Sequence, residues 1–286
     1  MSAVFSLVLA IAAVIFLVVA AGVIYGAVRY RSRGVASTEP RQIFGSRNVE
    51  IVWTLAPVLI LTGLFIVTVR AMVLIDAPQE TSQPPDLVIT AHQWWWEARY
   101  PNGVVVPWDI HIPTARRLRA RIESADVIHD FWVPELARKM DAVPGRWSYI
   151  WLEADTPGTY AGTCSEFCGA QHAWMRYRVI AEPEASFQAW LKYQARGVFN
   201  DAPSADERLF IDKCGRCHDF ASGKGPSLAH LASRETLGGG ITRNTPDNLM
   251  LWLTDPQAAK PGNRMPYIPL TADERRVLLT YLERLR

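Results

Sequence analysis

Two long apolar runs dominate the first third of the chain. Residues 3–28 carry no charged side chain, and neither do residues 51–69, which lie between Glu50 and Arg70. At about 1.5 Å per residue, each run is long enough to cross roughly 30 Å of hydrocarbon as a helix. A signal peptide would need a basic segment before a shorter apolar run, and nothing basic precedes the first run. The pattern therefore predicts a transmembrane helical hairpin over residues 1–75, rather than a signal peptide followed by a buried core helix.

The segment between the two runs is rich in arginine, with Arg29, Arg31, Arg33, Arg41 and Arg47 against Glu39 and Glu50. Short arginine-rich loops stay on the cytoplasmic side of a membrane. We therefore expect a two-pass protein whose termini, and everything after Arg70, lie on the outer face.

The pattern changes after a polar, proline-rich segment, residues 76–85, which is typical of a linker. Residues 86–182 hold short strand-like runs broken by Pro and Gly, and two of these runs alternate apolar with basic side chains. Such alternation favours strands with one buried face, and several of them in succession favour a β-sandwich or small barrel. The strand-like runs are residues 87–90, 109–112, 118–122 and 175–180.

The remainder of the chain has helical periodicity. Residues 184–196 predict a helix within a second linker, residues 183–201, and a helical domain follows at 202–286. In that domain Thr245 before Pro246 predicts a helix start, because Thr caps well and Pro fits the first helical turn. Thr271 and Glu274 have the spacing of a capping box at the start of the last helix. The architecture predicted is a membrane-anchored, multidomain protein.

Net charge excludes one large class of function. Thirty basic residues face 28 acidic ones, a net charge of +2. Nucleic-acid binders show a clustered basic excess, so we expect no nucleic-acid partner.

One run in the β-rich segment gathers soft metal ligands. Cys164, Cys168, His172 and Met175 fall within twelve residues, and thiolate, imidazole and thioether ligands favour copper over magnesium or calcium. The paired cysteines are also compatible with a disulfide or a zinc site, but structural zinc sites commonly add a second cysteine pair. A single copper needs only one Cys, whereas two coppers sharing both sulfurs would use both. Each would then need one imidazole, and His129 is the best candidate for the second.

A second motif, Cys214-Gly-Arg-Cys217-His218, has the form of a c-type haem attachment sequence. His218 would be the proximal axial ligand, and a methionine is the expected distal ligand. Met265 in Asn-Arg-Met-Pro is favoured over Met250, which lies in an apolar helical run. All four cysteines are then committed to a metal or to haem. A chain with both motifs is suited to moving single electrons.

These motifs resemble a known family, subunit II of the haem–copper cytochrome c oxidases. The resemblance is carried by Cys164–Met175 and Val127–Pro134, and it extends to residues 91–96 and 140–146. It implies a cupredoxin-like β-sandwich holding the dinuclear copper centre called CuA. Cys164 and Cys168 would bridge the coppers, His129 and His172 would be terminal ligands, and Met175 and the Glu166 carbonyl would be weak axial ligands. Residues 202–286 resemble small class I c-type cytochromes, all-α domains with covalent haem c.

The resemblance also implies roles outside the two cofactors. Trp94 would be the ring through which an electron arrives from a donor, and the Glu166 carboxylate would reach an interfacial magnesium ion. Asp141 and Arg146 would face the catalytic subunit I, and Glu50 would lie at the mouth of a proton-uptake path. The expected partners are subunits I and III, membrane lipid, and cytochrome c or another respiratory donor, and the expected location is a bacterial inner membrane with soluble domains in the periplasm.

The function expected is that of an oxidase subunit II with a fused cytochrome c. Electrons would pass from haem c to CuA and on to subunit I, where oxygen is reduced to water with proton pumping. Three other functions fit the sequence less well. A quinol oxidase subunit lacks the copper ligands, a nitrous oxide reductase needs a large histidine-rich domain, and a copper-delivery protein needs no covalent haem.

Overall fold

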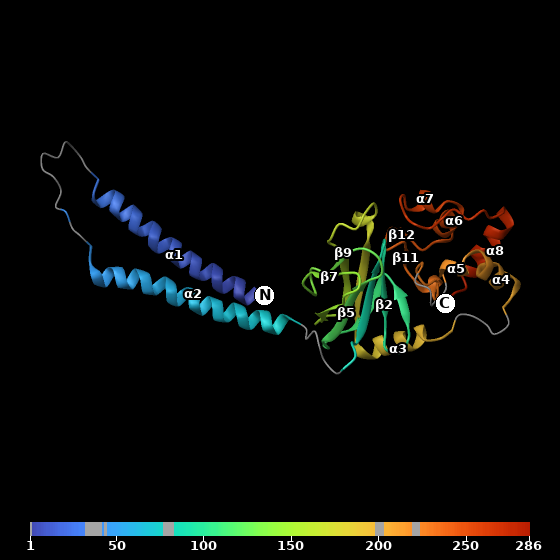
Figure 1. Ribbon diagram of the computed structural model, residues 1–286, viewed down its shortest axis with the longest axis horizontal. Coiled ribbons are helices and arrows are strands. Elements are labelled where there is room, and N and C mark those ends of the chain that lie inside the picture. The colour runs from blue at the N-terminus through green and yellow to red at the C-terminus, as the bar shows by residue number, and fades with distance from the viewer. Residues whose placement is uncertain (1, 32–41, 43–44, 77–82, 198–202, 219–223) are drawn as a thin grey trace. The chain divides into compact units, whose positions relative to one another are not determined.

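The structure is a computed structural model that describes residues 2–31, 42, 45–76, 83–197, 203–218 and 224–286. The chain divides into two compact units, Met1–Asp76 and Ala77–Arg286 (Figure 1). Residues 77–82, within the first predicted linker, and residues 198–202, at the predicted boundary between the second linker and the helical domain, lie outside the described residues. The linker and domain boundaries drawn from the sequence stay predictions.

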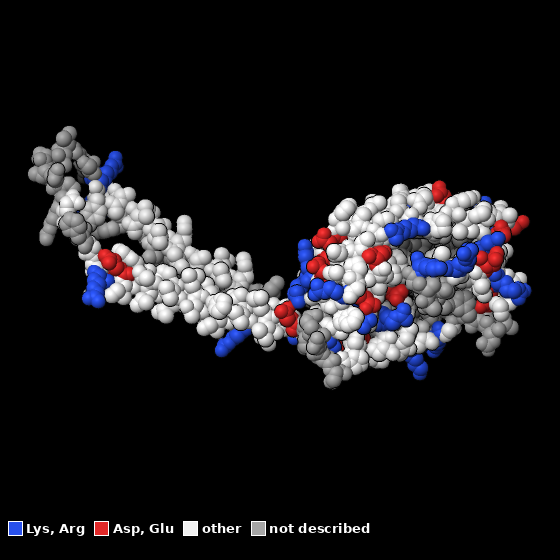
Figure 2. Space-filling model, in the orientation of Figure 1, with Lys and Arg blue, Asp and Glu red and all other residues white. Residues whose placement is uncertain are grey.

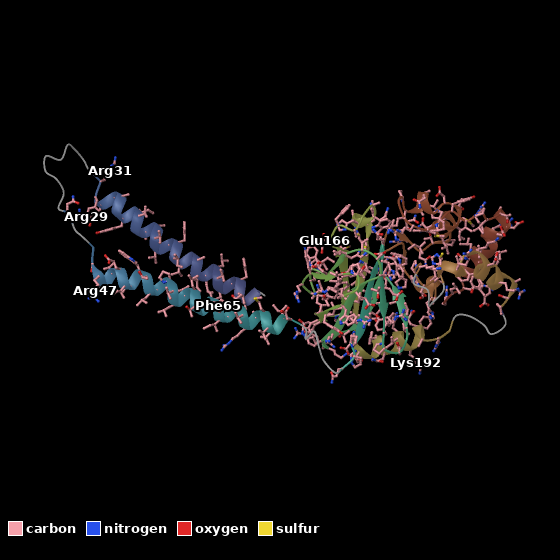
Figure 3. The ribbon with its side chains drawn as sticks, viewed as in Figure 1. Arg29, Arg31, Arg47, Phe65, Glu166 and Lys192 are labelled. Atoms are coloured by element: carbon pink, nitrogen blue, oxygen red, sulfur yellow. The ribbon has the colours of Figure 1, made fainter. Side chains whose placement is uncertain are left out.

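The first unit is a pair of apolar helices, α1 (Ser2–Arg29) and α2 (Arg47–Ile75). Their mean hydropathies reach 3.2 and 2.5, and both are long and apolar enough to cross a membrane. Figure 2 shows their surface almost without charge along its length. Arg29, Arg31 and Arg47 gather at the end where the helices are joined (Figure 3). Arg33, Arg41 and Glu39 lie outside the described residues.

The second unit begins with a β-sandwich of two five-stranded sheets. One sheet has the order β3-β2-β1-β5-β8 and the other the order β4-β10-β9-β6-β7, and within them only β1 with β5 and β4 with β10 pair in parallel. The strands are β1 (Leu87–His92), β2 (Trp95–Arg99), β3 (Val105–Pro107), β4 (Asp109–Pro113), β5 (Leu118–Ser124), β6 (His129–Trp132), β7 (Met140–Ala142), β8 (Ser148–Leu152), β9 (Gly158–Cys164) and β10 (Arg176–Glu182).

Alternation along the strands builds the core between the sheets. Leu87, Ile89 and Ala91 of β1 are buried while the residues between them are partly exposed, which is the pattern expected of a half-buried strand. At one end of the core Trp96 packs edge-on against Phe131, with ring centroids 5.5 Å apart. Three of the predicted strand-like runs lie wholly within strands, and the fourth, residues 175–180, is a strand from Arg176 onward.

After the sandwich come α3 (Glu184–Gln194), which lies against it, and a small helical domain. Trp190 of α3 stacks on His111, with ring centroids 3.9 Å apart. The helical domain contains α4 (Ala205–Lys213), α5 (Gly215–His218), α6 (Pro246–Thr254), α7 (Pro256–Ala259) and α8 (Ala272–Leu282). Two short 3-10 turns, η1 (His172–Trp174) and η2 (Leu231–Ser233), lie in loops of the sandwich and of the helical domain.

Both helix starts predicted from the sequence are confirmed. The Thr245 side chain accepts a hydrogen bond from the Asn248 backbone, and Thr271 with Glu274 forms a complete capping box. Phe210 of α4 packs against Tyr281 of α8 in the domain core. A hairpin of two-residue strands, β11 (Thr236–Leu237) and β12 (Thr242–Arg243), was not foreseen.

Candidate metal and haem sites

Three strand ends bring the copper-ligand candidates together at one end of the sandwich. His129 begins β6, Cys164 ends β9, and Met175 directly precedes β10. Phe131 of β6 pairs with Cys164, which fixes the register of these strands. The connecting loop closes on itself because the Cys164 N–H donates to the Met175 carbonyl over 3.1 Å. His129 and Met175, which are 46 positions apart in the sequence, thus lie around the same site as Cys164.

The donor atoms fall into two sets around the two sulfurs. His129 Nδ1 lies 3.8 Å from Cys164 Sγ, and the Glu166 carbonyl oxygen lies 3.3 Å from the same sulfur. Met175 Sδ and His172 Nδ1 lie 3.7 and 3.6 Å from Cys168 Sγ. The sulfurs themselves are 3.8 Å apart, far beyond the roughly 2.05 Å of a disulfide.

The chemistry of this donor set fits a pair of copper ions. Two thiols, two imidazoles and a fully buried thioether are the soft and borderline ligands that copper prefers. Zinc sites use Cys, His, Asp and Glu ligands, so a zinc site would leave the Met175 sulfur beside Cys168 without a role. Each sulfur has one imidazole and one weaker donor beside it, so the set divides evenly between two metals.

A neighbouring carboxylate, that of Asp126, orients the His129 imidazole. Asp126 Oδ1 lies 2.8 Å from His129 Nε2, so the ring donates there and presents Nδ1 to the sulfurs. The hydrogen bond between the two cysteine side chains lowers the pKa of Cys164 and raises that of Cys168, so one thiolate is favoured at neutral pH. Burial, with the Asp141 carboxylate nearby, raises the pKa of Asp130 to about 6.

The turn between β1 and β2 supports the cysteine loop from outside. Gln93 Nε2 and Trp94 Nε1 both donate to the Cys168 carbonyl oxygen, over 2.6 and 2.9 Å. Gly169 follows with a φ of +112°, a conformation that L residues rarely adopt, and a Cβ there would lie 3.0 Å from the Trp94 ring. Sequence analysis missed Asp126, Gln93 and Gly169, and only the glycine gave a local signal.

The haem motif begins at Cys214, the C-cap of α4, and continues through α5, and Cys214, Cys217 and His218 all line one cavity. His218 Nδ1 lies 2.9 Å from the Pro226 carbonyl oxygen, so that nitrogen donates and Nε2 is left for a metal. Burial lowers the pKa of His218, which favours the neutral, ligating imidazole. Gly225 permits this approach, because a Cβ there would lie 3.1 Å from the Cys217 carbonyl oxygen.

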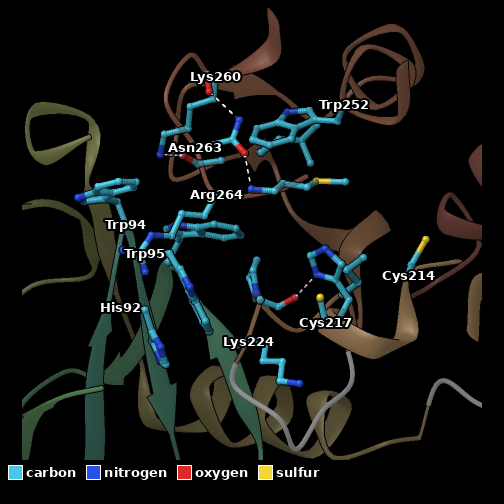
Figure 4. Close-up of a pocket in the computed structure, with 18 of the residues that line it drawn as sticks. His92, Trp94, Trp95, Cys214, Cys217, Lys224, Trp252, Lys260, Asn263 and Arg264 are labelled. Atoms are coloured by element: carbon cyan, nitrogen blue, oxygen red, sulfur yellow. Dashed lines mark hydrogen bonds between the residues drawn. The ribbon is translucent and has the colours of Figure 1, made fainter. Parts of the chain in front are cut away.

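A cavity of about 410 Å³ adjoins this motif (Figure 4). Its volume is within the range of cofactor pockets, and its lining is mostly apolar. Met265 lines the cavity, whereas Met250 on α6 is not among the described residues that do, which favours Met265 as the distal ligand. The sandwich contributes part of the wall, with His92, Gln93, Trp94, Trp95 and Trp108.

The other charged residues named from the sequence are exposed. Glu166, Asp141 and Arg146 are exposed on the sandwich, and Glu166 follows Cys164 by two residues. Glu50 is exposed in the first turn of α2. Trp94, by contrast, joins the two sites: it contacts Cys168 and lines the cavity.

Family models match most of the chain in three parts. Residues 1–70 match the transmembrane domain of cytochrome c oxidase subunit II, residues 103–182 match its periplasmic domain, and residues 207–286 match cytochrome c. Cytochrome c oxidase subunit 2 of Alkalihalophilus pseudofirmus is 31% identical over 90% of this chain and 79% of the relative. The chain belongs to the cytochrome c oxidase subunit II family.

Other subunits II give the same picture. The subunit 2 of Bacillus subtilis is 31% identical over 92% of this chain and 82% of its own length. The subunit 2 of Thermostichus vulcanus is 29% identical over 82% of this chain and 86% of its own length. Among solved structures, the periplasmic domain of subunit II from Bradyrhizobium japonicum is 28% identical, covering 40% of this chain and 96% of its own with a TM-score of 0.37. A chain of a solved haem–copper terminal oxidase dimer is 26% identical. The match covers 48% of this chain and 100% of that one, also with a TM-score of 0.37.

The family confirms the predicted fold class of this subunit II. It has two membrane-spanning helices, a cupredoxin-like β-sandwich and a helical cytochrome c domain. It is a membrane-anchored part of an oxidase complex with a role in electron transfer, and the family implies both CuA copper and haem.

Proposed function

We propose that this subunit II receives electrons on a covalent haem c and delivers them through a dinuclear CuA centre to the haem of catalytic subunit I. Oxygen is reduced to water there, with proton pumping. The observation that carries the proposal is the gathering of two sulfurs, two imidazoles and a thioether at one strand end, next to a cavity that also borders a haem-attachment motif.

Cys164 and Cys168 would hold both metals of the proposed copper centre through their thiolates, and His129 and His172 would each bind one of them. Met175 and the Glu166 carbonyl are the weak axial ligands, one beside each sulfur. Bound copper supplies one-electron redox chemistry, and sharing the electron over two metals keeps bond-length changes small. The protein's part is to hold the ligands rigidly, which strand ends and the buried Trp96–His129 contact support.

In the cytochrome c domain, Cys214 and Cys217 form the thioether bonds to haem and His218 and Met265 bind its iron. Bound haem supplies a second one-electron carrier, and a methionine ligand raises its potential. The Pro226 carbonyl holds the His218 ring in the orientation that presents Nε2. Trp94 is the proposed electron-transfer residue, since its indole lies between the cavity and the Cys168 carbonyl.

The remaining assignments concern the assembled oxidase. The arginines at the joined end of the hairpin favour a cytoplasmic loop, with both termini and the soluble domains in the periplasm of a bacterial inner membrane. Asp141 and Arg146 contact subunit I, the Glu166 carboxylate binds an interfacial magnesium ion, and Glu50 lies at a proton-uptake mouth. Subunit III and a respiratory donor such as cytochrome c complete the partners.

Metal and haem analysis of the purified full-length subunit tests the proposal. We expect two coppers and one covalent haem per chain, with a mixed-valence electron paramagnetic resonance signal split by two equivalent copper nuclei. His129→Ala should abolish that signal and leave the haem spectrum intact. His111→Ala, which changes a histidine stacked on Trp190 away from the ligands, is the matched control. One copper per chain, bound zinc, or iron in noncovalent form only would overturn the proposal.

A further inference from the structure

The cytochrome c domain and the sandwich meet at an arginine that has no part in either ligand set. Arg264 directly precedes Met265, and its guanidinium donates a hydrogen bond to Gln93 Oε1 in the β1–β2 turn. The same guanidinium lies over the Trp94 ring, 5.3 Å from its centroid. Figure 4 shows Arg264 reaching from the cytochrome c side of the cavity toward Trp94 and Trp95.

The contact continues directly to a proposed copper ligand. Gln93 and Trp94 are the two side chains whose N–H groups donate to the Cys168 carbonyl oxygen. One arginine therefore touches both side chains that hold the Cys168 loop, while its neighbour in sequence is the proposed distal haem ligand. Electron transfer between two centres slows steeply as their separation grows, so a contact that fixes this separation controls the rate.

Other contacts make a defined docked arrangement. Lys260 is buried and its amine donates to the carbonyl oxygens of Trp174 in the sandwich and Gly238 in the cytochrome c domain, over 3.3 and 3.2 Å. Arg178 of β10 pairs with Glu235 over 2.8 Å. Exposed ion pairs contribute little, so the Arg178 contact alone would not hold the domains in one position.

Arg264 differs from these because both of its partners hold the Cys168 carbonyl and one of them, Trp94, is the proposed electron-transfer residue. We propose that Arg264 is a positioning residue for electron transfer, which holds the cytochrome c domain against the β1–β2 turn so that the haem and copper sites keep a fixed short separation. The inference rests on the proposed function, since it presupposes haem at Cys214 and Cys217 and copper at Cys164 and Cys168. A guanidinium suits the task because it can stack on an indole and donate hydrogen bonds at the same time.

The test uses the intact oxidase with both cofactors loaded. The haem is reduced by flash photolysis of a ruthenium donor, and its reoxidation is followed together with the near-infrared band of the copper centre. In Arg264→Ala we expect the rate of transfer from haem to copper to fall about tenfold, the factor that one hydrogen bond to a charged group is typically worth. The potentials and spectra of both centres should stay unchanged.

Two variants separate positioning from a general loss of charge. Arg264→Lys keeps the charge over Trp94 and one hydrogen bond, so it should recover part of the rate. Arg276→Ala removes an exposed arginine of α8 that pairs with Asp273, and it should transfer at the wild-type rate. A merely structural role for Arg264 would instead alter a spectrum or a potential.

Each outcome decides between the alternatives. Slower transfer in Arg264→Ala with both centres unaltered supports the inference. An unchanged rate overturns it, and so does a slower rate accompanied by a changed copper spectrum or potential, because Arg264 would then act on the centre itself. Wild-type oxidase that lacks copper, or that transfers no electron from haem to copper, would instead refute the proposed function on which the inference rests.

Discussion

Replacing Gly169 by alanine should disturb the copper site more than the size of one methyl group suggests. The φ of +112° at Gly169 strains any L residue, which costs about 1–3 kcal/mol. The new Cβ would also lie 3.0 Å from the Trp94 ring and 3.2 Å from Gln93 Nε2. These are the two side chains that donate to the Cys168 carbonyl, so the methyl group competes with both hydrogen bonds.

The magnitude follows from adding these effects. Each lost hydrogen bond costs about 0.5–1.5 kcal/mol, so the two together add about 1–3 kcal/mol to the backbone strain. Gly103 offers a matched control in the same sandwich, because its φ is +86° and a Cβ there meets nothing within 4 Å. Gly103→Ala should therefore show the strain alone, and Gly169→Ala should be less stable than that control by about 1–3 kcal/mol.

Calorimetry of the full-length subunit in detergent measures the difference. In a domain of roughly 100 residues each 1 kcal/mol shifts the Tm by about 4–8 °C, so the sandwich transition of Gly169→Ala should lie at least about 4 °C below that of Gly103→Ala. The visible spectrum of the copper centre should change in Gly169→Ala alone. Equal transition temperatures in the two variants, with identical copper spectra, would refute the assigned support of Cys168 by Gln93 and Trp94.

Three further predictions concern the cytochrome c domain. Met265→His should keep its covalent haem but lower the haem potential, measured by redox titration, and an unchanged potential would mean that another residue is the distal ligand. Gly225→Ala should reduce the amount of covalently bound haem, measured after acid extraction, because its Cβ would lie 3.1 Å from the Cys217 carbonyl oxygen. The control Gly197→Ala, whose Cβ would meet nothing within 4 Å, should bind haem normally. Thr271→Ala removes the capping box of α8 and should cost about 1 kcal/mol of unfolding free energy by urea titration, whereas Thr280→Ala on the same helix should cost less.

The sequence predicted elements where local chemistry decides the structure. Alternation identified β5 and β10, and a threonine before Pro246 identified the start of α6, because each signal lies within the element itself. The proposed copper ligands could also be predicted as a set, since the side chains of four of them share one short loop, residues 164–175. His129 had to be chosen among the four histidines outside the cysteine loop and the haem motif, and the pairing of β6 with β9 brings it beside Cys164.

The three consecutive tryptophans show where a local pattern fails. As a strand they would alternate between two faces, but the chain turns after His92 and resumes as a strand at Trp95. Trp95 and Trp96 are therefore buried, while Trp94 stays in the turn and reaches Cys168, which lies 74 residues away. Likewise, Gln93 and Arg264 are 171 residues apart, and no spacing in the sequence indicates that they meet.

The turn between β1 and β2 joins the two cofactor sites because its side chains use different groups on each side. Gln93 donates through Nε2 to the Cys168 carbonyl and accepts through Oε1 from Arg264. Trp94 donates through Nε1 to the same carbonyl and offers its ring face to the guanidinium. A glutamate at position 93 would keep the acceptor and lose the donor, and a leucine would lose both. The Gln93 amide makes both contacts, so a single side chain links the cytochrome c domain to the proposed copper loop.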